Sequence, residues 1–215
     1  MSGIVYVIRN GLQWKDAPSG YGPPKTLHNR FTRWSRLGVF DRIFAALEGE
    51  GPKPGRIMVD ATPPQGSSHC GKPAQKAALS RCIGRTKGGL NSKLHAVCDA
   101  NGKPLILLLS EGQMSDHTGA RHILDALSPA KTLLADRGYD SNWFREGLAE
   151  KGIEPCIPST RTRKVPLHYD AVVYRQRHRI ENMFAKLKDW RRIATRYDRC
   201  AHTFFSAICI FYLNQ

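Results

Sequence analysis

The sequence predicts an α/β fold in which a mixed sheet is covered by helices on both faces, with a small helical element in front of it. Two observations support this prediction. From residue 56 onward, short apolar runs typical of buried strands alternate with segments of helical periodicity. Residues 1–48, by contrast, show only short helical patterns, separated by turns rich in glycine and proline.

The N-terminal element is expected to contain two or three short helices. Thr26 is expected to cap a helix whose apolar residues share one face, namely Leu27, Phe31, Trp34 and Leu37. A basic second face interleaves with them and consists of Arg30, Arg33 and Arg36. A further helix over Phe40–Leu47 ends at Gly49. The pattern fits two structures: a helix-turn-helix-like DNA-binding element, or an ordinary amphipathic helix whose arginines are solvated.

A linker and a regular order of strands and helices follow this element. Residues 49–55 (GEGPKPG) form the expected linker, because glycine and proline fill five of its seven positions. The turn Asn101-Gly102 joins two strands into a hairpin, and residues 63–88 are expected to form a mobile loop. The predicted strands are 56–59, 90–98, 104–109, 131–135 and 153–157, and the predicted helices are 116–127, 141–151, 170–190 and 202–214.

The charge of the chain points to a nucleic acid as its partner. The 215 residues carry 33 Lys and Arg against 18 Asp and Glu, a formal net charge of +15, and the hydrophobic content of 41% is that of a globular protein. Phosphate binding by basic side chains is favoured by the release of counterions. Residues 161–199 alone hold 12 basic and four acidic residues, which favours a DNA-binding track over a merely solvated surface.

The sequence predicts neither a membrane span nor a disulfide framework. The longest apolar run, Phe204–Leu213, is about half the ~20 residues that a bilayer-spanning helix needs, and residues 1–14 lack a secretory signal. The six cysteines include no CxxC pair. We therefore expect reduced thiols in a cytoplasmic protein rather than zinc ligands.

Two aspartates stand directly after apolar runs and are candidates for chemistry. Asp60 is expected to close the first strand, and Asp136 follows the strand 131–135. Ligands of α/β sheets bind in crevices at the carboxyl ends of strands, where two carboxylates could share Mg²⁺ or Mn²⁺. Each aspartate could instead simply cap the turn that follows it.

A third carboxylate lies in the predicted helix 170–190. At about 100° per residue, four polar side chains fall on one stripe about 60° wide, namely Tyr174, Arg177, Glu181 and Lys188. A carboxylate flanked by two cations and a phenol suits a face that holds a metal and grips phosphate oxygens. The other interpretation is a surface helix with an Arg177–Glu181 ion pair.

Together these residues resemble a known family. Asp60 in V-D-A-T, Asp136 in A-D-R-G-Y-D and the pattern Y-x2-R-x3-E-x6-K occur in the order found in the DDE transposases of bacterial insertion sequences, in the branch known as insertion sequence five. Three further segments are similar to that branch, namely 23–34, 84–93 and Ser115-Asp116-His117. The resemblance covers nearly the whole chain.

The resemblance implies a ribonuclease-H-like catalytic domain over residues 56–215 and a metal-dependent reaction. Asp60, Asp136 and Glu181 would bind two Mg²⁺ or Mn²⁺ ions and catalyse cleavage and strand transfer of DNA. Family members usually carry further residues before the segment matching Gly3–Trp14, so the DNA-binding element 1–48 is expected to be incomplete.

The resemblance also implies which residues meet DNA. The partner would be double-stranded DNA, both transposon ends and target, bound by a homodimer associated with the bacterial nucleoid. Tyr174, Arg177 and Lys188 would contact its phosphates, and Arg30 and Arg33 are the expected contacts of the N-terminal element.

Two other functions stay open from the sequence. The first is a catalytically silent, N-terminally shortened DNA-binding remnant of such a transposase. The second is a basic RNA-binding or ribosome-associated protein, which is disfavoured because it gives no reason for the three carboxylates.

Overall fold

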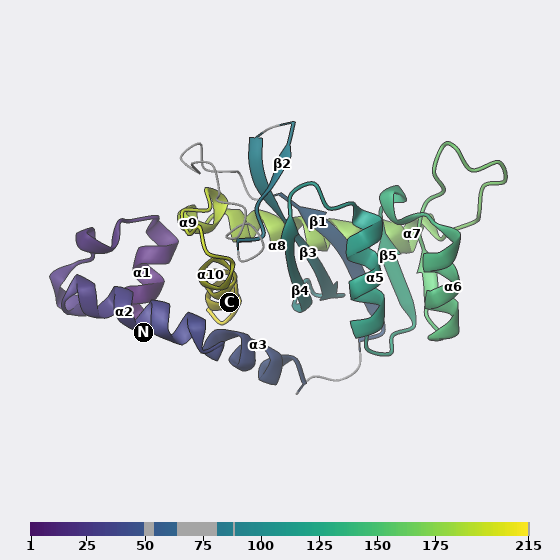
Figure 1. Cartoon of the computed structure of the whole chain (residues 1–215). Helices are drawn as coiled ribbons and strands as arrows, with labels where there is room; N and C mark the ends of the chain where they lie inside the picture. The colour runs from purple at the N-terminus through teal and green to yellow at the C-terminus, as the bar shows by residue number, and fades with distance from the viewer. Residues whose placement is uncertain (50–53, 64–80, 88, 215) are drawn as a thin grey trace.

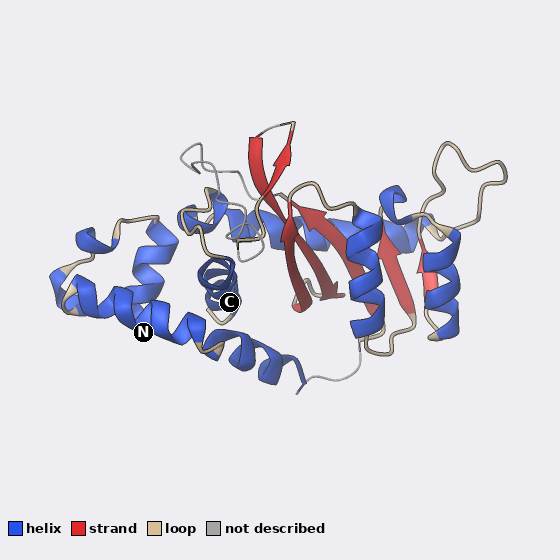
Figure 2. Ribbon diagram, viewed as in Figure 1, coloured by secondary structure: helices blue, strands red, loops and turns tan. Residues whose placement is uncertain are grey.

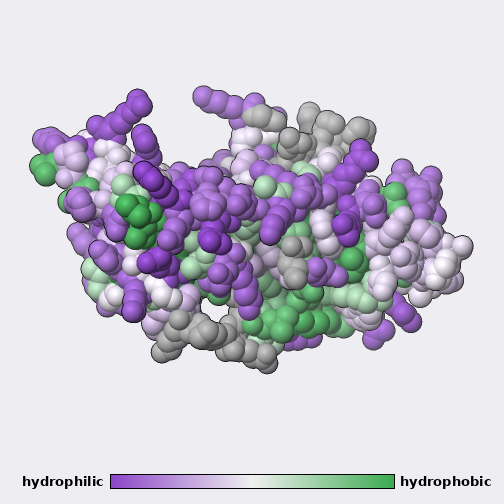
Figure 3. All heavy atoms as spheres, turned by 180° about the vertical axis from the view of Figure 1, so that it is seen from behind, coloured by the Kyte–Doolittle hydropathy of each residue, from purple (hydrophilic) through white to green (hydrophobic). Residues whose placement is uncertain are grey.

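The computed structural model describes residues 1–49, 54–63, 81–87 and 89–214. Within these ranges it forms a mixed sheet with helices on both faces and a group of N-terminal helices at one end (Figures 1 and 2). No helix in the described ranges is long and apolar enough to cross a bilayer. Hydrophilic residues cover most of the face seen in Figure 3.

Three helices and two short 3-10 turns make up the N-terminal element. The helix α2 begins at Pro24, so the prediction that Thr26 caps it was wrong. Proline is favoured at the first helical position because its missing N–H needs no partner there. Leu27 and Phe31 are buried as predicted, whereas Leu37 lies past the last turn and is exposed. The elements are α1 (Ser2–Asn10), η1 (Trp14–Asp16), η2 (Ser19–Tyr21), α2 (Pro24–Arg36) and α3 (Val39–Gly49).

The central sheet has the strand order β4-β3-β1-β5-β6, and β2 pairs with the first residues of β3. The pairs β4–β3 and β3–β1 are antiparallel, and the pairs β1–β5 and β5–β6 are parallel. The predicted mixed α/β fold is therefore confirmed. The strands are β1 (Arg56–Thr62), β2 (Gly84–Thr86), β3 (Gly89–Asp99), β4 (Pro104–Glu111), β5 (Thr132–Ala135) and β6 (Glu154–Cys156).

The predicted hairpin and all five predicted strands are present. The strand β2 was missed, because it lies inside the segment 63–88 that was predicted to be a loop. Of that segment, residues 64–80 and 88 lie outside the described ranges, as do residues 50–53 of the predicted linker.

Both faces of the sheet are buried. Along β1, Ile57 and Val59 point to one side and join a cluster with α5 (Asp116–Ala126) and α6 (Asn142–Glu150). Met58 points to the other side and joins a larger cluster with α8 (His178–Lys188) and α10 (Ala201–Tyr212). The alternation follows from the two-residue repeat of a strand.

The single helix expected over residues 170–190 is divided into three pieces. They are α7 (Ala171–Tyr174), the 3-10 turn η4 (Arg175–Arg177) and α8. A 3-10 turn advances by about 120° per residue instead of about 100°, so the predicted 60° stripe holds within α8 but not across η4. A short helix that was not predicted, α9 (Arg191–Ala194), follows α8.

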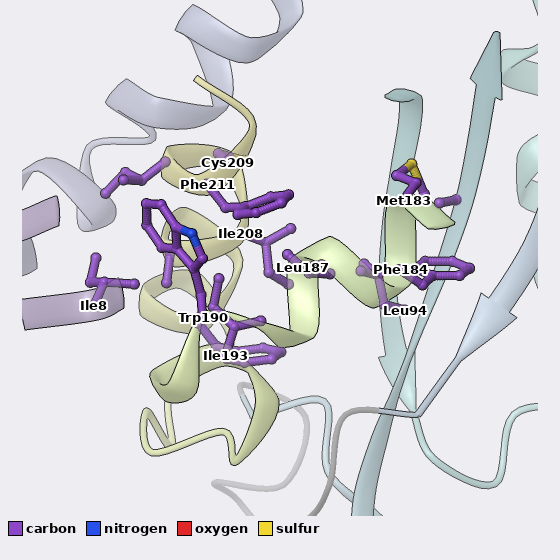
Figure 4. Close-up of a cluster of buried hydrophobic side chains, with 14 of the residues drawn as sticks. Ile8, Leu94, Met183, Phe184, Leu187, Trp190, Ile193, Ile208, Cys209 and Phe211 are labelled. Atoms are coloured by element: carbon purple, nitrogen blue, oxygen red, sulfur yellow. The ribbon is translucent and has the colours of Figure 1, made fainter. Parts of the chain in front are cut away.

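The larger hydrophobic cluster joins the two ends of the chain. In Figure 4, Ile8 of α1 lies beside Trp190 and near Ile208, Cys209 and Phe211 of α10. Phe31 of α2 belongs to the same cluster. The N-terminal helices are therefore packed against the C-terminal helices rather than held by the linker alone.

Candidate active site

Asp60 of β1 and Asp136, the residue that follows β5, lie side by side at neighbouring parallel strands. Val59 of β1 pairs with Ala135 of β5, and the two aspartates are the next residues on these strands, which run about 4.8 Å apart. Asp136 follows β5 directly, as predicted, and its Oδ1 accepts a hydrogen bond of 2.9 Å from the N–H of Gly138. The carboxylate thus also caps the turn η3 (Arg137–Tyr139).

Asp60 lies inside its strand rather than at its end, which corrects the prediction. β1 continues to Thr62, because the antiparallel partner β3 extends its pairing to Thr62↔Leu94, beyond the end of β5. Burial raises the pKa of the Asp60 carboxyl above its ordinary value. The positive charge of Arg177 opposes this shift, and the negative charge of Asp136 adds to it.

Arg177 connects Asp60 to Glu181. Its Nη1 donates to Asp60 Oδ2 at 2.9 Å, and its Nη2 donates to Glu181 Oε1 at 2.6 Å. The Arg177–Glu181 ion pair expected for a surface helix is therefore present, but the same guanidinium also reaches a carboxylate 117 positions earlier in the chain. Side chains from β1, η4 and α8 thus meet at one centre.

The three carboxylates have the right chemistry for a divalent metal, but they do not converge in this structure. In the described part of the chain, no group of three or more His, Cys, Asp or Glu side chains is arranged to hold a metal ion. The Arg177 guanidinium instead bonds to both Asp60 and Glu181. Carboxylate oxygens are the ligands preferred by Mg²⁺ and Mn²⁺, so the donor set itself fits these ions.

The other residues predicted to contact DNA do not all lie near Asp60, Arg177 and Glu181. Tyr174 is half-buried against Tyr169, with ring centroids 5.4 Å apart, and burial raises the pKa of its hydroxyl. Lys188 is exposed on α8, beside a small apolar pocket that includes Thr62 of β1. Arg30 and Arg33 are exposed on α2. Figure 1 shows α2 and β5 at opposite ends of the molecule, so these two arginines are not part of the centre.

Sequence reasoning did not assign Asp116 and Lys93 to the site. Asp116 begins α5, and its Oδ1 accepts a hydrogen bond of 3.0 Å from Lys93 Nζ. A Cβ added to Gly138 would lie 2.9 Å from Asp136 Oδ1 and 3.6 Å from Asp116 Oδ2, so the two carboxylates flank this glycine. The signal available in the sequence was the family-like segment Ser115-Asp116-His117.

Asp140 has a structural task next to α6, although it does not cap this helix. The N-cap of α6 is Ser141, which makes no side-chain capping bond. The buried Asp140 carboxylate accepts hydrogen bonds from the side chains of Arg145 and Arg163 and from the N–H of Thr160. It therefore ties the basic segment after β6 to α6.

Two family models match this chain. Residues 51–213 match the model described as "Transposase DDE domain", and residues 1–44 match the model described as "Putative transposase of IS4/5 family". The first range includes Asp60, Asp136 and Glu181.

Two similar proteins are also described as transposases of insertion sequence elements. A "Putative transposase for insertion sequence element IS402" of Burkholderia cepacia is 35% identical over 141 residues, which cover 57% of this chain and 64% of that protein. The protein of Brucella ovis with the same designation for element IS6501 is 33% identical over 120 residues, which cover 55% of this chain and 92% of that protein. The aligned part of this chain thus spans less than two thirds of the IS402 protein.

Among solved structures, the piggyBac transposase synaptic complex with hairpin DNA has a TM-score of 0.47 and 9% identity, over 75% of this chain and 41% of that chain. This similarity is too low to bear on the assignment. The family model, in contrast, covers most of the chain, and the resemblance seen in the sequence is confirmed. The chain belongs to the transposase DDE domain family.

Proposed function

We propose that this chain is a transposase that binds the ends of an insertion sequence and cuts and rejoins double-stranded DNA, with Asp60, Asp136 and Glu181 as its catalytic carboxylates. One observation carries the proposal. Three acidic residues from distant parts of the sequence are linked beside the C-terminal end of β5, two by strand register and the third through Arg177. An amphipathic surface helix alone gives no reason for the contact between Arg177 and Asp60.

The carboxylates would hold two Mg²⁺ or Mn²⁺ ions. When bound, such ions polarise the scissile phosphate and lower the pKa of the attacking water or 3′-hydroxyl. Asp60 would present its oxygens from the strand β1, and Asp136 from the turn that directly follows β5, where its hydrogen bond to Gly138 restricts its movement. Glu181 stands on α8 and is 56% exposed at its side chain, so it has room to adjust.

Arg177 would change partners when DNA binds. Its guanidinium neutralises Asp60 and Glu181 in this structure, and it would have to release them before the carboxylates could bind metal. A DNA phosphate is a suitable new acceptor, because guanidinium binds phosphate in the same bidentate manner as carboxylate.

The remaining DNA contacts would extend over the basic surface. We infer that Tyr174 and Lys188 contact phosphates near the cut, and that Arg30 and Arg33 contact the duplex further away. Such a protein would act on the chromosome in the bacterial cytoplasm. A homodimer would allow the two ends of one element to be held together.

The experiment is cleavage of end-labelled DNA that carries the inverted repeats flanking the gene, with Mg²⁺ or Mn²⁺. Wild type is compared with Asp136→Asn and with the matched control Asp125→Asn at the far end of α5. Cutting by wild type and the control, and loss of cutting in Asp136→Asn, supports the proposal. Binding of the end DNA without any cutting by wild type favours the silent remnant, and preference for structured RNA favours an RNA-binding protein.

A further inference from the structure

A fourth carboxylate faces the same place as Asp136. Asp116 uses its Oδ1 for the ion pair with Lys93 Nζ, which also donates to the carbonyl oxygen of Met114 at 3.0 Å. Its Oδ2 faces Gly138, whose N–H is bonded to Asp136 Oδ1. The two carboxylates are therefore separated by a residue without a side chain, and a Cβ at Gly138 would come within 2.9 Å of Asp136 Oδ1.

A buried hydroxyl without a partner lies beside this group. Tyr139 is 1% exposed, and its hydroxyl has no hydrogen-bond partner among the described residues. Burial raises the pKa of Tyr139, and the negative charges of Asp116, Asp60 and Asp136 raise it further. Tyr139 directly follows Gly138, the residue that lies between the two carboxylates. A buried hydroxyl normally has a hydrogen-bond partner, so the Tyr139 hydroxyl has hydrogen-bonding capacity available for a group that binds here.

We propose that Asp116 is a further metal-binding carboxylate of the catalytic centre, beside Asp60, Asp136 and Glu181. The inference rests on the proposed function and adds to it a residue of α5. In this proposal, Lys93 pairs with one oxygen of Asp116, and the other oxygen, which faces Gly138, binds the metal. Lys93 also reduces the repulsion among the aspartates in the absence of metal.

The competing explanation is that Asp116 serves only the fold, as the ion-pair partner of Lys93 and as an acidic residue in the first turn of α5. Two substitutions separate the explanations, because both remove the ion pair but only one removes the carboxylate. Asp116→Asn keeps the side-chain shape and removes the charge. Lys93→Met keeps the length of the side chain and leaves the carboxylate in place.

The test is a titration of the full chain with Mn²⁺, in which free Mn²⁺ is measured by electron paramagnetic resonance. We expect Asp116→Asn to weaken the binding of at least one ion by about tenfold or more. Lys93→Met should leave Mn²⁺ binding unchanged or tighten it, and Asp116→Glu should retain part of it. Asp125→Asn, on the same helix, is the control for the loss of one charge, and thermal unfolding checks that each variant is folded.

Equal weakening in Asp116→Asn and Lys93→Met would overturn the inference, since the ion pair alone would then explain it. Unchanged Mn²⁺ binding in Asp116→Asn, together with a loss in Asp136→Asn, would also overturn it but leave the proposed function standing. Unchanged binding in Asp60→Asn, Asp136→Asn and Asp116→Asn alike would refute the metal centre and the inference together.

Discussion

The guanidinium of Arg177 lies between two carboxylates that the proposed function assigns to metal binding. It bonds to Asp60 and to Glu181, whose mutual repulsion it relieves. A side chain with this double role couples two binding events, because whatever draws Arg177 away makes the carboxylates available. By linkage, DNA should raise the affinity for metal, and metal should raise the affinity for DNA to the same extent.

The first prediction follows for Arg177→Ala. Without DNA, Mn²⁺ should bind more tightly than to wild type, because the competing cation is gone. DNA binding should weaken, and the slope of log K against log salt should fall by about 0.9, as for one lost phosphate contact. The control is Arg175→Ala, an exposed arginine in the same 3-10 turn. Weaker Mn²⁺ binding in Arg177→Ala would mean that Arg177 supports the metal site instead of competing for it.

The second prediction concerns Glu181→Gln. The variant should fold as wild type does, because an exposed helical pair such as Arg177–Glu181 contributes only about 0.2–0.5 kcal/mol. DNA binding should persist or tighten, because a charge that repels phosphates is lost. Strand cleavage should fall by orders of magnitude when the two proteins are compared at equal occupancy of end-labelled DNA with Mg²⁺. Cutting at the wild-type rate would make Glu181 a simple surface residue.

The third prediction is a pH dependence of stability that comes from His95. This residue of β3 is fully buried, and burial lowers its pKa from 6.5 to about 4. The unfolded chain therefore takes up a proton between these values while the folded chain does not. Above pH 6.5, His95 should not change the free energy of unfolding. Between pH 6.5 and 4, protonation of His95 in the unfolded chain should lower the free energy of unfolding by about 3 kcal/mol.

Urea unfolding at a series of pH values tests this contribution. A His95→Leu variant loses the hydrogen bond to Ser110 and starts from a lower stability at neutral pH. Its stability should nevertheless decline less steeply than that of wild type between pH 6.5 and 4. Parallel curves for the two proteins would show that His95 does not titrate differently on folding.

At the scale of elements, the sequence predicted what depends on local pattern. The apolar run before Asp136 gave β5, and Asn101-Gly102 gave the β3–β4 hairpin. The end of β1 could not be predicted, because it is set by pairing with β3, which runs past β5. The same holds for the contact of Arg177 with Asp60, which depends on a 3-10 turn and on strand register.

The fourth prediction belongs to the connection between β6 and α7. Although burial opposes ionisation, the hydrogen bonds from Arg163, Thr160 and Arg145 hold the pKa of Asp140 well below its ordinary value. Asp140→Ala leaves two arginines without their shared acceptor, and loss of one partner of a buried ion pair costs about 3 kcal/mol. Urea unfolding should show this loss, and trypsin should cut faster at the exposed Arg161 and Lys164. Unchanged trypsin cleavage would mean that the segment is held by other contacts.

At the scale of the whole molecule, the sequence suggested a helical element, a linker and a catalytic domain, with boundaries at residues 48 and 56. That division stays a prediction. The N-terminal helices α1, α2 and α3 share a hydrophobic cluster with α8, α9 and α10. This shared cluster should make the unfolding of the two parts depend on each other. Arg192 adds a polar tie: it is bonded to Asp198, donates to the carbonyl oxygen of Leu12 and stacks over Trp14.

The last prediction tests whether the two parts unfold together. Phe31 of α2 is 1% exposed in the shared cluster, so Phe31→Ala should cost about 3–5 kcal/mol. If the shared cluster makes the chain one cooperative unit, the opening free energies of the slowest-exchanging amides in β1 and β5 should fall by the same amount as those in α1 and α2. Hydrogen exchange followed by mass spectrometry measures both regions in one experiment.

The control is Leu148→Ala, whose side chain lies in the other hydrophobic cluster, with residues of α5 and α6. In a cooperative chain it should lower protection in α1 and α2 as well. Loss of protection confined to α1–α3 in Phe31→Ala would instead show an N-terminal element that unfolds separately, so that the DNA contacts proposed for Arg30 and Arg33 could be lost without disturbing Asp60 and Asp136.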